Sequence, residues 1–110
     1  MKVTEKEGYK ILQDEKDDVT EFASFLESSH ERFKDDNVVI DILKYGELSL
    51  QELLKFLKLS NKHRQGKKSF VIANDTINID QVPEELVVVP TLEEAGDIIE
   101  MEEIERDLGF

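Results

Sequence analysis

Residues 37–57 constrain the fold more than any other part of the sequence, because they join a strand pattern to a helix pattern across a short turn. A short β-branched apolar run favours a strand, and it consists of Val38, Val39, Ile40 and Ile42. Apolar residues on both faces of this run predict a parallel strand covered by helices. Asp41 interrupts the run, so its carboxylate must lie near a strand end or accept hydrogen bonds.

The turn after this strand leads into a predicted helix. Gly46 gives the backbone freedom to turn. Ser49 and Glu52 have the spacing of a capping box, in which each side chain accepts a hydrogen bond from the other residue's backbone amide. One buried stripe is expected at Leu50, Leu53, Leu54 and Leu57, and a second apolar side at Phe56 and Leu59. The helix is expected to end near Gly66.

Further elements precede and follow this unit. Two short strands around Gly8 predict a hairpin over residues 2–13, and a helix is expected from Asp17 or Asp18 to about residue 34. Its predicted buried residues are Val19, Phe22, Phe25, Leu26 and Phe33. Strands are expected at 69–73 and 86–89, with a brief extended piece at 77–80. Thr91 and Glu94 then begin a C-terminal helical segment.

This C-terminal segment, residues 91–108, has an apolar pattern that changes phase. The expected inward face is Leu92, Ala95, Ile98, Ile99 and Met101, and Ile104 and Leu108 extend it with a drift that suggests two short helices. The whole order is β-β-α-β-α-β-β-α. Alternating strands and helices predict right-handed crossovers and an α/β fold, with a mixed sheet of an N-terminal hairpin plus mostly parallel strands, and three to four helices.

Composition sets the class of protein. The chain has 110 residues, which suits a single domain over residues 1–110. It has no cysteine and no apolar run near the roughly 20 residues that span a membrane. Its first residues have no apolar stretch typical of a secretory signal. We therefore expect a soluble cytoplasmic protein without membrane contact.

The charge is strongly negative and unevenly distributed. Fourteen basic and 26 acidic residues give a net charge of −12, which opposes nucleic-acid binding as a general property. Eight acids lie in the C-terminal segment, at Glu93, Glu94, Asp97, Glu100, Glu102, Glu103, Glu105 and Asp107. Six bases form a candidate basic face, at Lys55, Lys58, Lys62, Arg64, Lys67 and Lys68.

Each charged region has alternative interpretations. The basic face could bind an acidic partner or RNA, although a solvated helix end is favoured because no aromatic residues alternate with the bases. The acidic helix could dock on a basic protein or have a hydrated outer face. The two regions could also pair with each other, within the chain or across a homodimer.

Motifs of catalysis are missing from the sequence. His30 and His63 are too isolated for metal-ligand spacing, and the acids form no recognisable catalytic pair. The glycine-rich phosphate-binding motifs and the nucleophile elbow are absent. The sequence therefore predicts a non-enzymatic protein that needs neither a metal nor a cofactor.

The order of elements resembles the STAS domain, the fold of bacterial anti-sigma factor antagonists. The resemblance rests on the N-terminal strand pair, on VVIDI before a serine-capped helix, on SFVIAN, and on LVVVPTLEEAGDII. In that family a serine at the helix start is phosphorylated by a partner kinase, and Ser49 falls at the matching place. The family's Asp before this serine and Gly after it are absent here, where the chain reads Glu47-Leu48-Ser49-Leu50.

The resemblance implies a protein-interaction module whose partner is a regulatory protein such as an anti-sigma factor or a kinase. Ser49 is then the candidate phospho-acceptor. The expected binding residues are Lys44, Tyr45, Gly46, Glu47, Leu48, Ser49, Leu50 and Leu53.

A second resemblance supports an alternative function. The end of the chain is similar to that of small proteins labelled ribonuclease Z, an enzyme that needs a His-x-His-x-Asp-His motif. Two histidines cannot supply that motif. The alternative is therefore an accessory protein of an RNA-processing enzyme, acting through the basic face.

Overall fold

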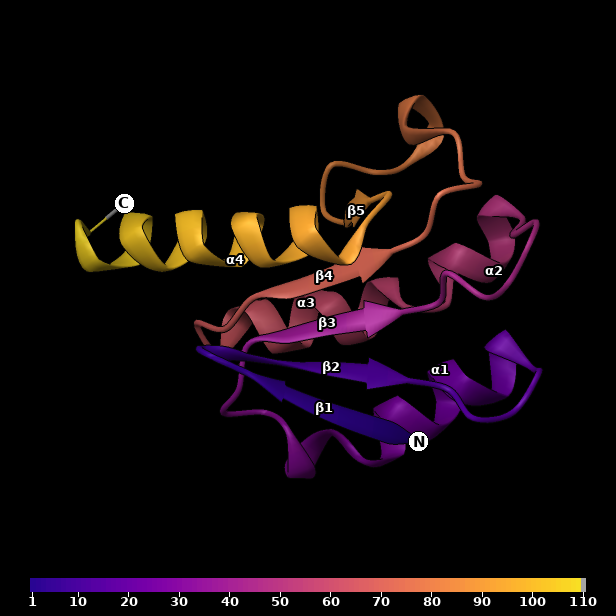
Figure 1. Cartoon of the computed structure of the whole chain (residues 1–110), viewed down its shortest axis with the longest axis horizontal. Helices are drawn as coiled ribbons and strands as arrows, with labels where there is room; N and C mark the ends of the chain where they lie inside the picture. Colours follow the sequence, from indigo (N-terminus) through magenta and orange to yellow (C-terminus); the bar gives the residue numbers. More distant parts are fainter. Residues whose placement is uncertain (110) are drawn as a thin grey trace.

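A hairpin begins the sheet, and parallel strands extend it on one side. A computed structural model describes residues 1–109 (Figure 1). Within them the strands lie in chain order: β1 (Lys2–Lys6), β2 (Tyr9–Gln13), β3 (Val38–Asp41), β4 (Phe70–Ala73) and β5 (Val87–Val89). β1 and β2 pair antiparallel across Gly8, whose φ is +88°, and all later pairs are parallel. The predicted α/β fold class is confirmed.

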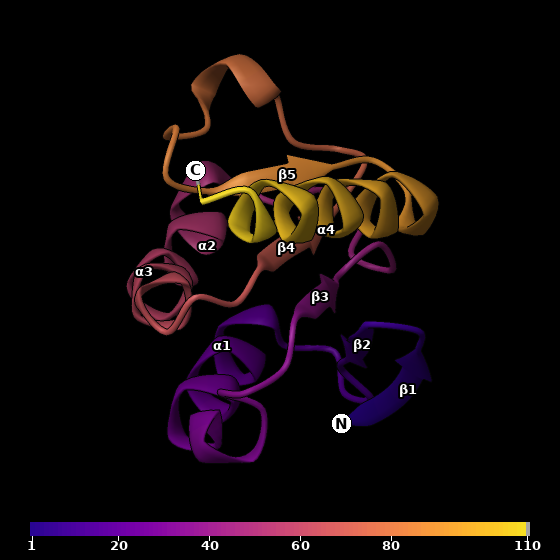
Figure 2. The same cartoon turned by 90° about the vertical axis from the view of Figure 1, so that its left-hand side faces the viewer.

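The helices form layers on both faces of the sheet (Figure 2). One face is covered by α1 (Val19–Ser28), α2 (Leu50–Leu54) and α3 (Leu57–Gln65), and the other by α4 (Leu92–Asp107). Parallel strands added in one direction through right-handed crossovers place their connecting helices on one face. The last helix follows no further strand, so it is free to cover the opposite face.

The two central strands are buried on both faces, as their sequences predict. Every residue of β3 and β4 is buried. Val39 and Val71 face α4, whereas Ile40 and Ile72 face the other helices. Asp41 is the last residue of β3, and its Oδ1 accepts a hydrogen bond from the Leu43 amide at 3.1 Å. Because Asp41 lies at the strand end and accepts this hydrogen bond, its carboxylate avoids the free-energy cost of unpaired burial.

The helix predicted after Ser49 is divided into α2 and α3. Between them the amide of Phe56 bonds to the carbonyl of Leu53, three residues back, at 3.1 Å. Such a tightened turn aligns residues three apart, so Leu53 and Phe56 both enter the core. The predicted stripe is therefore wrong in part: the buried residues are Leu53, Phe56, Leu59, Ser60 and His63, and Leu50, Leu54 and Leu57 are partly exposed.

Other boundaries also differ from the prediction. α1 ends at Ser28 and a short 3₁₀ turn, η1 (His30–Arg32), follows it. Phe25 lies on the outer side of α1 and is 41% exposed. The expected extended piece at 77–80 is instead a 3₁₀ turn, η2 (Ile79–Gln81), because the Asn78 side chain accepts from the Asp80 amide at 3.0 Å.

α4 is one continuous helix, so the division into two short helices that the drift suggested does not occur. Thr91 begins it by accepting a hydrogen bond from the Glu94 amide at 3.1 Å. Ala95 and Ile99 pack on the sheet, but Met101 points outward, where the prediction placed it inward. The change of phase in the sequence therefore reflects side chains that leave the core rather than a break in the backbone.

Candidate functional site

Three consecutive parallel strands end in the same kind of turn. At the carboxyl end of each strand, an Asp or Asn side chain folds back and accepts a hydrogen bond from the backbone amide two residues later. The pairs are Asp14 with Lys16 at 3.0 Å, Asp41 with Leu43 at 3.1 Å, and Asn74 with Thr76 at 3.0 Å. Such turns fix the start of each loop. In open α/β sheets this edge is the usual place for ligands.

The loops after β2 and β3 are joined to each other. The Tyr45 hydroxyl donates a hydrogen bond to Asp14 Oδ2, and Lys44 Nζ donates to the carbonyl of Lys16. Lys44 Nζ also lies 3.7 Å from a carboxylate oxygen of Asp17. Burial, with the Asp14 carboxylate beside it, raises the pKa of Tyr45 far above its ordinary value. The hydroxyl therefore stays protonated and holds the two loops together.

A cleft of about 320 Å³ lies beside this junction. Its lining consists of Met1, Asp14, Glu15, Lys16, Asp18, Glu21, Phe22 and Phe25. The four carboxylates outnumber the two cations, although the Met1 ammonium lies 2.9 Å from Glu15 Oε1 and Lys16 Nζ lies 3.9 Å from Glu21 Oε1. Carboxylates around an apolar surface suit a side chain that carries both a hydrocarbon stem and a positive charge. The cleft thus has the chemistry to hold a lysine or arginine of another protein.

Ser49 lies on the same edge and begins α2. Its hydroxyl oxygen accepts from the Glu52 amide at 3.1 Å, and Glu52 Oε1 accepts from the Ser49 amide at 3.0 Å. The predicted capping box is confirmed. The Ser49 side chain is exposed, but its phosphorylation stays a prediction. A phosphate there would have to replace the cap bonds beside the Glu52 carboxylate, which repels it.

The predicted binding residues separate into a surface group and a core group. Lys44, Gly46, Glu47 and Ser49 are exposed, and Tyr45 and Leu50 are partly exposed. Leu48 and Leu53 are only 8% and 0% exposed, because they pack in the core under α2. These two leucines are therefore corrected from binding residues to core residues.

The predicted basic face is not continuous. Arg64 turns toward α4, where its Nη1 lies 3.2 Å from Glu102 Oε1 and its Nη2 donates to the Phe70 carbonyl at 3.0 Å. Lys58 Nζ lies 3.6 Å from Glu27 Oε1. Pairing within the chain, one of the alternatives above, is thus what the structure shows for Arg64. Lys55, Lys62 and Lys67 are exposed, and Lys68 is partly exposed.

The two histidines, predicted to be isolated, form a buried pair. His30 Nε2 lies 2.9 Å from His63 Nδ1, and His63 Nε2 lies 2.8 Å from the Asp36 carbonyl. A carbonyl only accepts, so His63 Nε2 donates and its Nδ1 accepts from His30. Burial lowers the pKa of His63 to about 4 and also lowers the pKa of His30. The neutral pair links η1 to α3.

The sequence analysis predicted no functional role for residues 14–18, so the cleft beside them was not expected. The signal was available: β2 and β3 were both expected in one sheet, and parallel strands bring their following loops together at one edge. Within residues 1–109 no group of three or more His, Asp or Glu side chains is placed to hold a metal ion.

No protein-family model matches the sequence, and no curated protein matches it closely enough to count as a relative. The STAS resemblance therefore stays a prediction. Among the helices formed by residues 1–109, none has both the length and the apolar character needed to cross a membrane.

Proposed function

We propose that this protein works by binding a partner protein rather than by catalysis. The binding site would be its carboxyl-edge surface, which we define as residues 14–18, residues 44–47, Ser49 and the exposed Phe25. The observation that carries the proposal is the Tyr45–Asp14 hydrogen bond, which joins two loops beside an acidic and aromatic cleft. A surface preorganised in this way loses little conformational entropy when a partner binds.

The roles of the polar groups support binding over chemistry. Asp14, Asp41 and Asn74 each use an oxygen to hold a loop amide, and Asp14 also holds Tyr45. These groups shape the surface. A proton-transfer catalyst would instead need a group that is placed against a substrate and tuned near neutral pH.

The chemistry of the surface suggests the kind of partner. Acids outnumber bases in the lining of the cleft, and Phe25, which is 41% exposed, adds apolar contact area. A basic segment with apolar side chains would be complementary. The STAS resemblance adds that the partner is a regulatory protein, such as an anti-sigma factor or a kinase.

The accessory role in RNA processing receives less support. Two bases of the basic face already pair within the chain, Arg64 with Glu102 and the exposed Lys58 with Glu27. The net charge of −12 also repels RNA. These charges favour a protein partner over RNA.

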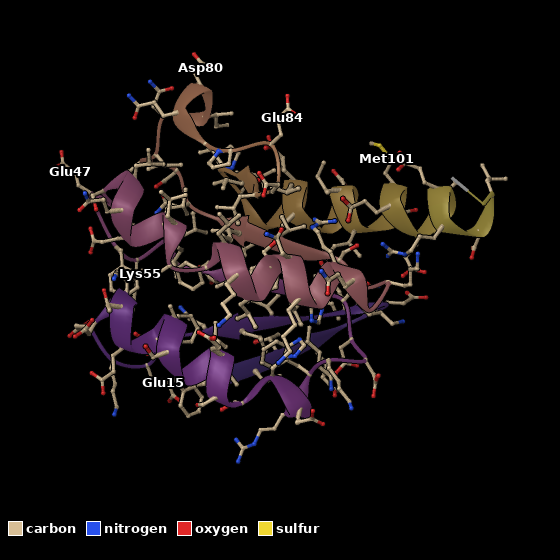
Figure 3. The ribbon with its side chains drawn as sticks, turned by 180° about the vertical axis from the view of Figure 1, so that it is seen from behind. Glu15, Glu47, Lys55, Asp80, Glu84 and Met101 are labelled. Atoms are coloured by element: carbon tan, nitrogen blue, oxygen red, sulfur yellow. The ribbon has the colours of Figure 1, made fainter. Side chains whose placement is uncertain are left out.

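The test is capture of partners from the source cell by tagged protein. The key variant, Glu15→Lys with Glu47→Lys, reverses two exposed charges that lie at the same end of the molecule (Figure 3). The matched control, Glu84→Lys with Glu85→Lys, makes the same charge change on the exposed loop before β5. We expect a partner that the wild type and control capture equally and that the key variant captures about tenfold less, a loss of about 1.4 kcal/mol.

A third variant covers the alternative. Lys55→Glu with Lys62→Glu reverses two exposed charges of the basic face. If this variant loses the partner while the carboxyl-edge variant keeps it, the proposal is wrong. Recovery of RNA or an RNA-processing enzyme, lost between low and moderate salt, would point to the accessory role instead.

A further inference from the structure

In the second half of α4 the large apolar side chains face solvent, whereas Glu102, Glu103 and Arg106 turn toward the rest of the protein. In the first half, Ala95 and Ile99 are buried against the sheet. Beyond them, Met101 and Ile104 of α4 are 54% and 53% exposed, and Leu108, which directly follows the helix, is 66% exposed. We call these three residues the α4 stripe. An ordinary amphipathic helix would have turned them toward the core.

A polar network sets this rotation of the helix. Glu102 pairs with Arg64, Glu103 accepts from the Asn37 side chain at 2.7 Å, and Arg106 donates to Ser69 Oγ at 3.0 Å. Turning α4 to bury Ile104 would break these bonds. The exposure of the stripe is therefore built into the fold.

The stripe is a concentrated apolar surface. Six large apolar side chains are exposed within residues 1–109, and the other three, Val3, Phe25 and Ile79, lie on three different elements. Met101, Ile104 and Leu108 follow one another at i, i+3 and i+7, the spacing of a coiled-coil seam. Apolar residues gathered in this way mark a protein-interaction surface.

The charges beside the stripe indicate which kind of partner it would bind. Asp97, Glu100, Glu105 and Asp107 are exposed acids on the same helix. A second copy packed helix against helix would oppose these acids to their own equivalents. We propose that the α4 stripe binds a basic amphipathic helix of a partner protein, whose apolar side chains cover the stripe while its lysines or arginines pair with the acids.

This surface is separate from the carboxyl-edge surface. α4 begins after β5 at the carboxyl edge and runs back along the sheet toward the amino ends of the strands (Figure 1). Figure 3 shows Met101 on α4, far along the molecule from Glu15 and Glu47. The protein would therefore have one binding surface at each end of its sheet.

The probe for this proposal is a synthetic helical peptide of about three heptads, with leucine at a and d and lysine at e and g. Two control peptides carry either glutamate in place of lysine or the same residues in scrambled order. Binding to the full chain is measured by fluorescence anisotropy at low and moderate salt. We expect the basic amphipathic peptide to bind and both controls to fail.

Variants then locate the binding. Ile104→Ser with Leu108→Ser should weaken binding about tenfold or more, whereas Val3→Ser with Ile79→Ser, also at exposed positions, should leave it unchanged. Glu15→Lys with Glu47→Lys should leave it unchanged as well, which separates this surface from the carboxyl edge. Glu100→Gln with Glu105→Gln should weaken binding and reduce its salt dependence.

Three results would overturn the proposal. The first is no binding of the basic peptide to the wild type, and the second is equal binding by the stripe variant. The third is a wild-type dimer in sedimentation that the stripe variant abolishes, because a second copy would then cover the stripe.

Discussion

At the scale of single residues, Ser49 uses both its hydroxyl and its backbone amide to hold the first turn of α2. Ser49→Ala removes the acceptor for the Glu52 amide, and we expect it to lower the free energy of unfolding by about 1 kcal/mol. Ser49→Asp should lose less, because Asp is also a good cap. Urea unfolding measures both. An unchanged stability in Ser49→Ala would show that α2 does not depend on this cap.

The buried histidine pair makes stability depend on pH. The folded pKa of His63 is about 4, below its ordinary value of 6.5, so the unfolded chain binds more protons between these values. The stability that the neutral His63 contributes is therefore fully present above about pH 6.5 and is lost as the pH drops toward about 4. Lys62, next to His30, and Arg64, next to His63, oppose a positive charge here as well.

His63→Gln tests this pH dependence, because an amide can both donate to Asp36 and accept from His30 without titrating. Between pH 7.5 and 5.0 the wild type should lose about 1–2 kcal/mol more stability than the variant. Urea unfolding at the two pH values gives the difference. Parallel losses in both proteins would mean that the pair does not control acid sensitivity.

At the scale of elements, Asn37 fastens α4 to the amino edge of the sheet. Its Oδ1 accepts from the Ser69 amide at 2.8 Å, and its Nδ2 donates to the Gly8 carbonyl and to Glu103. The Asn37 and Arg106 bonds lower the pKa of Glu103 below its ordinary value, so this carboxylate stays charged. One side chain thus joins the hairpin, β4 and α4.

Asn37→Ala should lower the free energy of unfolding by about 2–3 kcal/mol, because it leaves the buried Ser69 amide without a partner. Asn37→Asp keeps that acceptor but places a second carboxylate beside Glu103. Adding Glu103→Gln should recover part of the loss in Asn37→Asp and none in Asn37→Ala. Equal effects of Glu103→Gln on both would show that this contact does not fasten the helix.

Elements were predictable where local chemistry alone decides them. The β-branched run of β3 and the caps at Ser49 and Thr91 depend on neighbours in sequence, and the structure confirms them. The rotation of α4 was not predictable, because Glu102 and Glu103 find their partners on α3 and before β3. The hydrophobicity pattern of one helix does not show which residues of other elements its side chains will contact.

At the scale of the whole molecule, the sheet gives the protein two different ends. The carboxyl end has short turns that join loops, and the amino end has the network that fixes α4. The loop after β3 could be predicted as a surface because it lies between a strand and a capped helix. Its link to Asp14 could not, because Tyr45 lies far from Asp14 in the sequence.

The most direct test of the central claim is hydrogen–deuterium exchange of the protein alone and in complex with the partner it captures. We predict slower amide exchange in residues 14–25 and 42–50 on binding, since these segments contain the carboxyl-edge surface. Slower exchange confined to residues 55–68, with the carboxyl-edge segments unchanged, would contradict the claim and place the partner on the basic face.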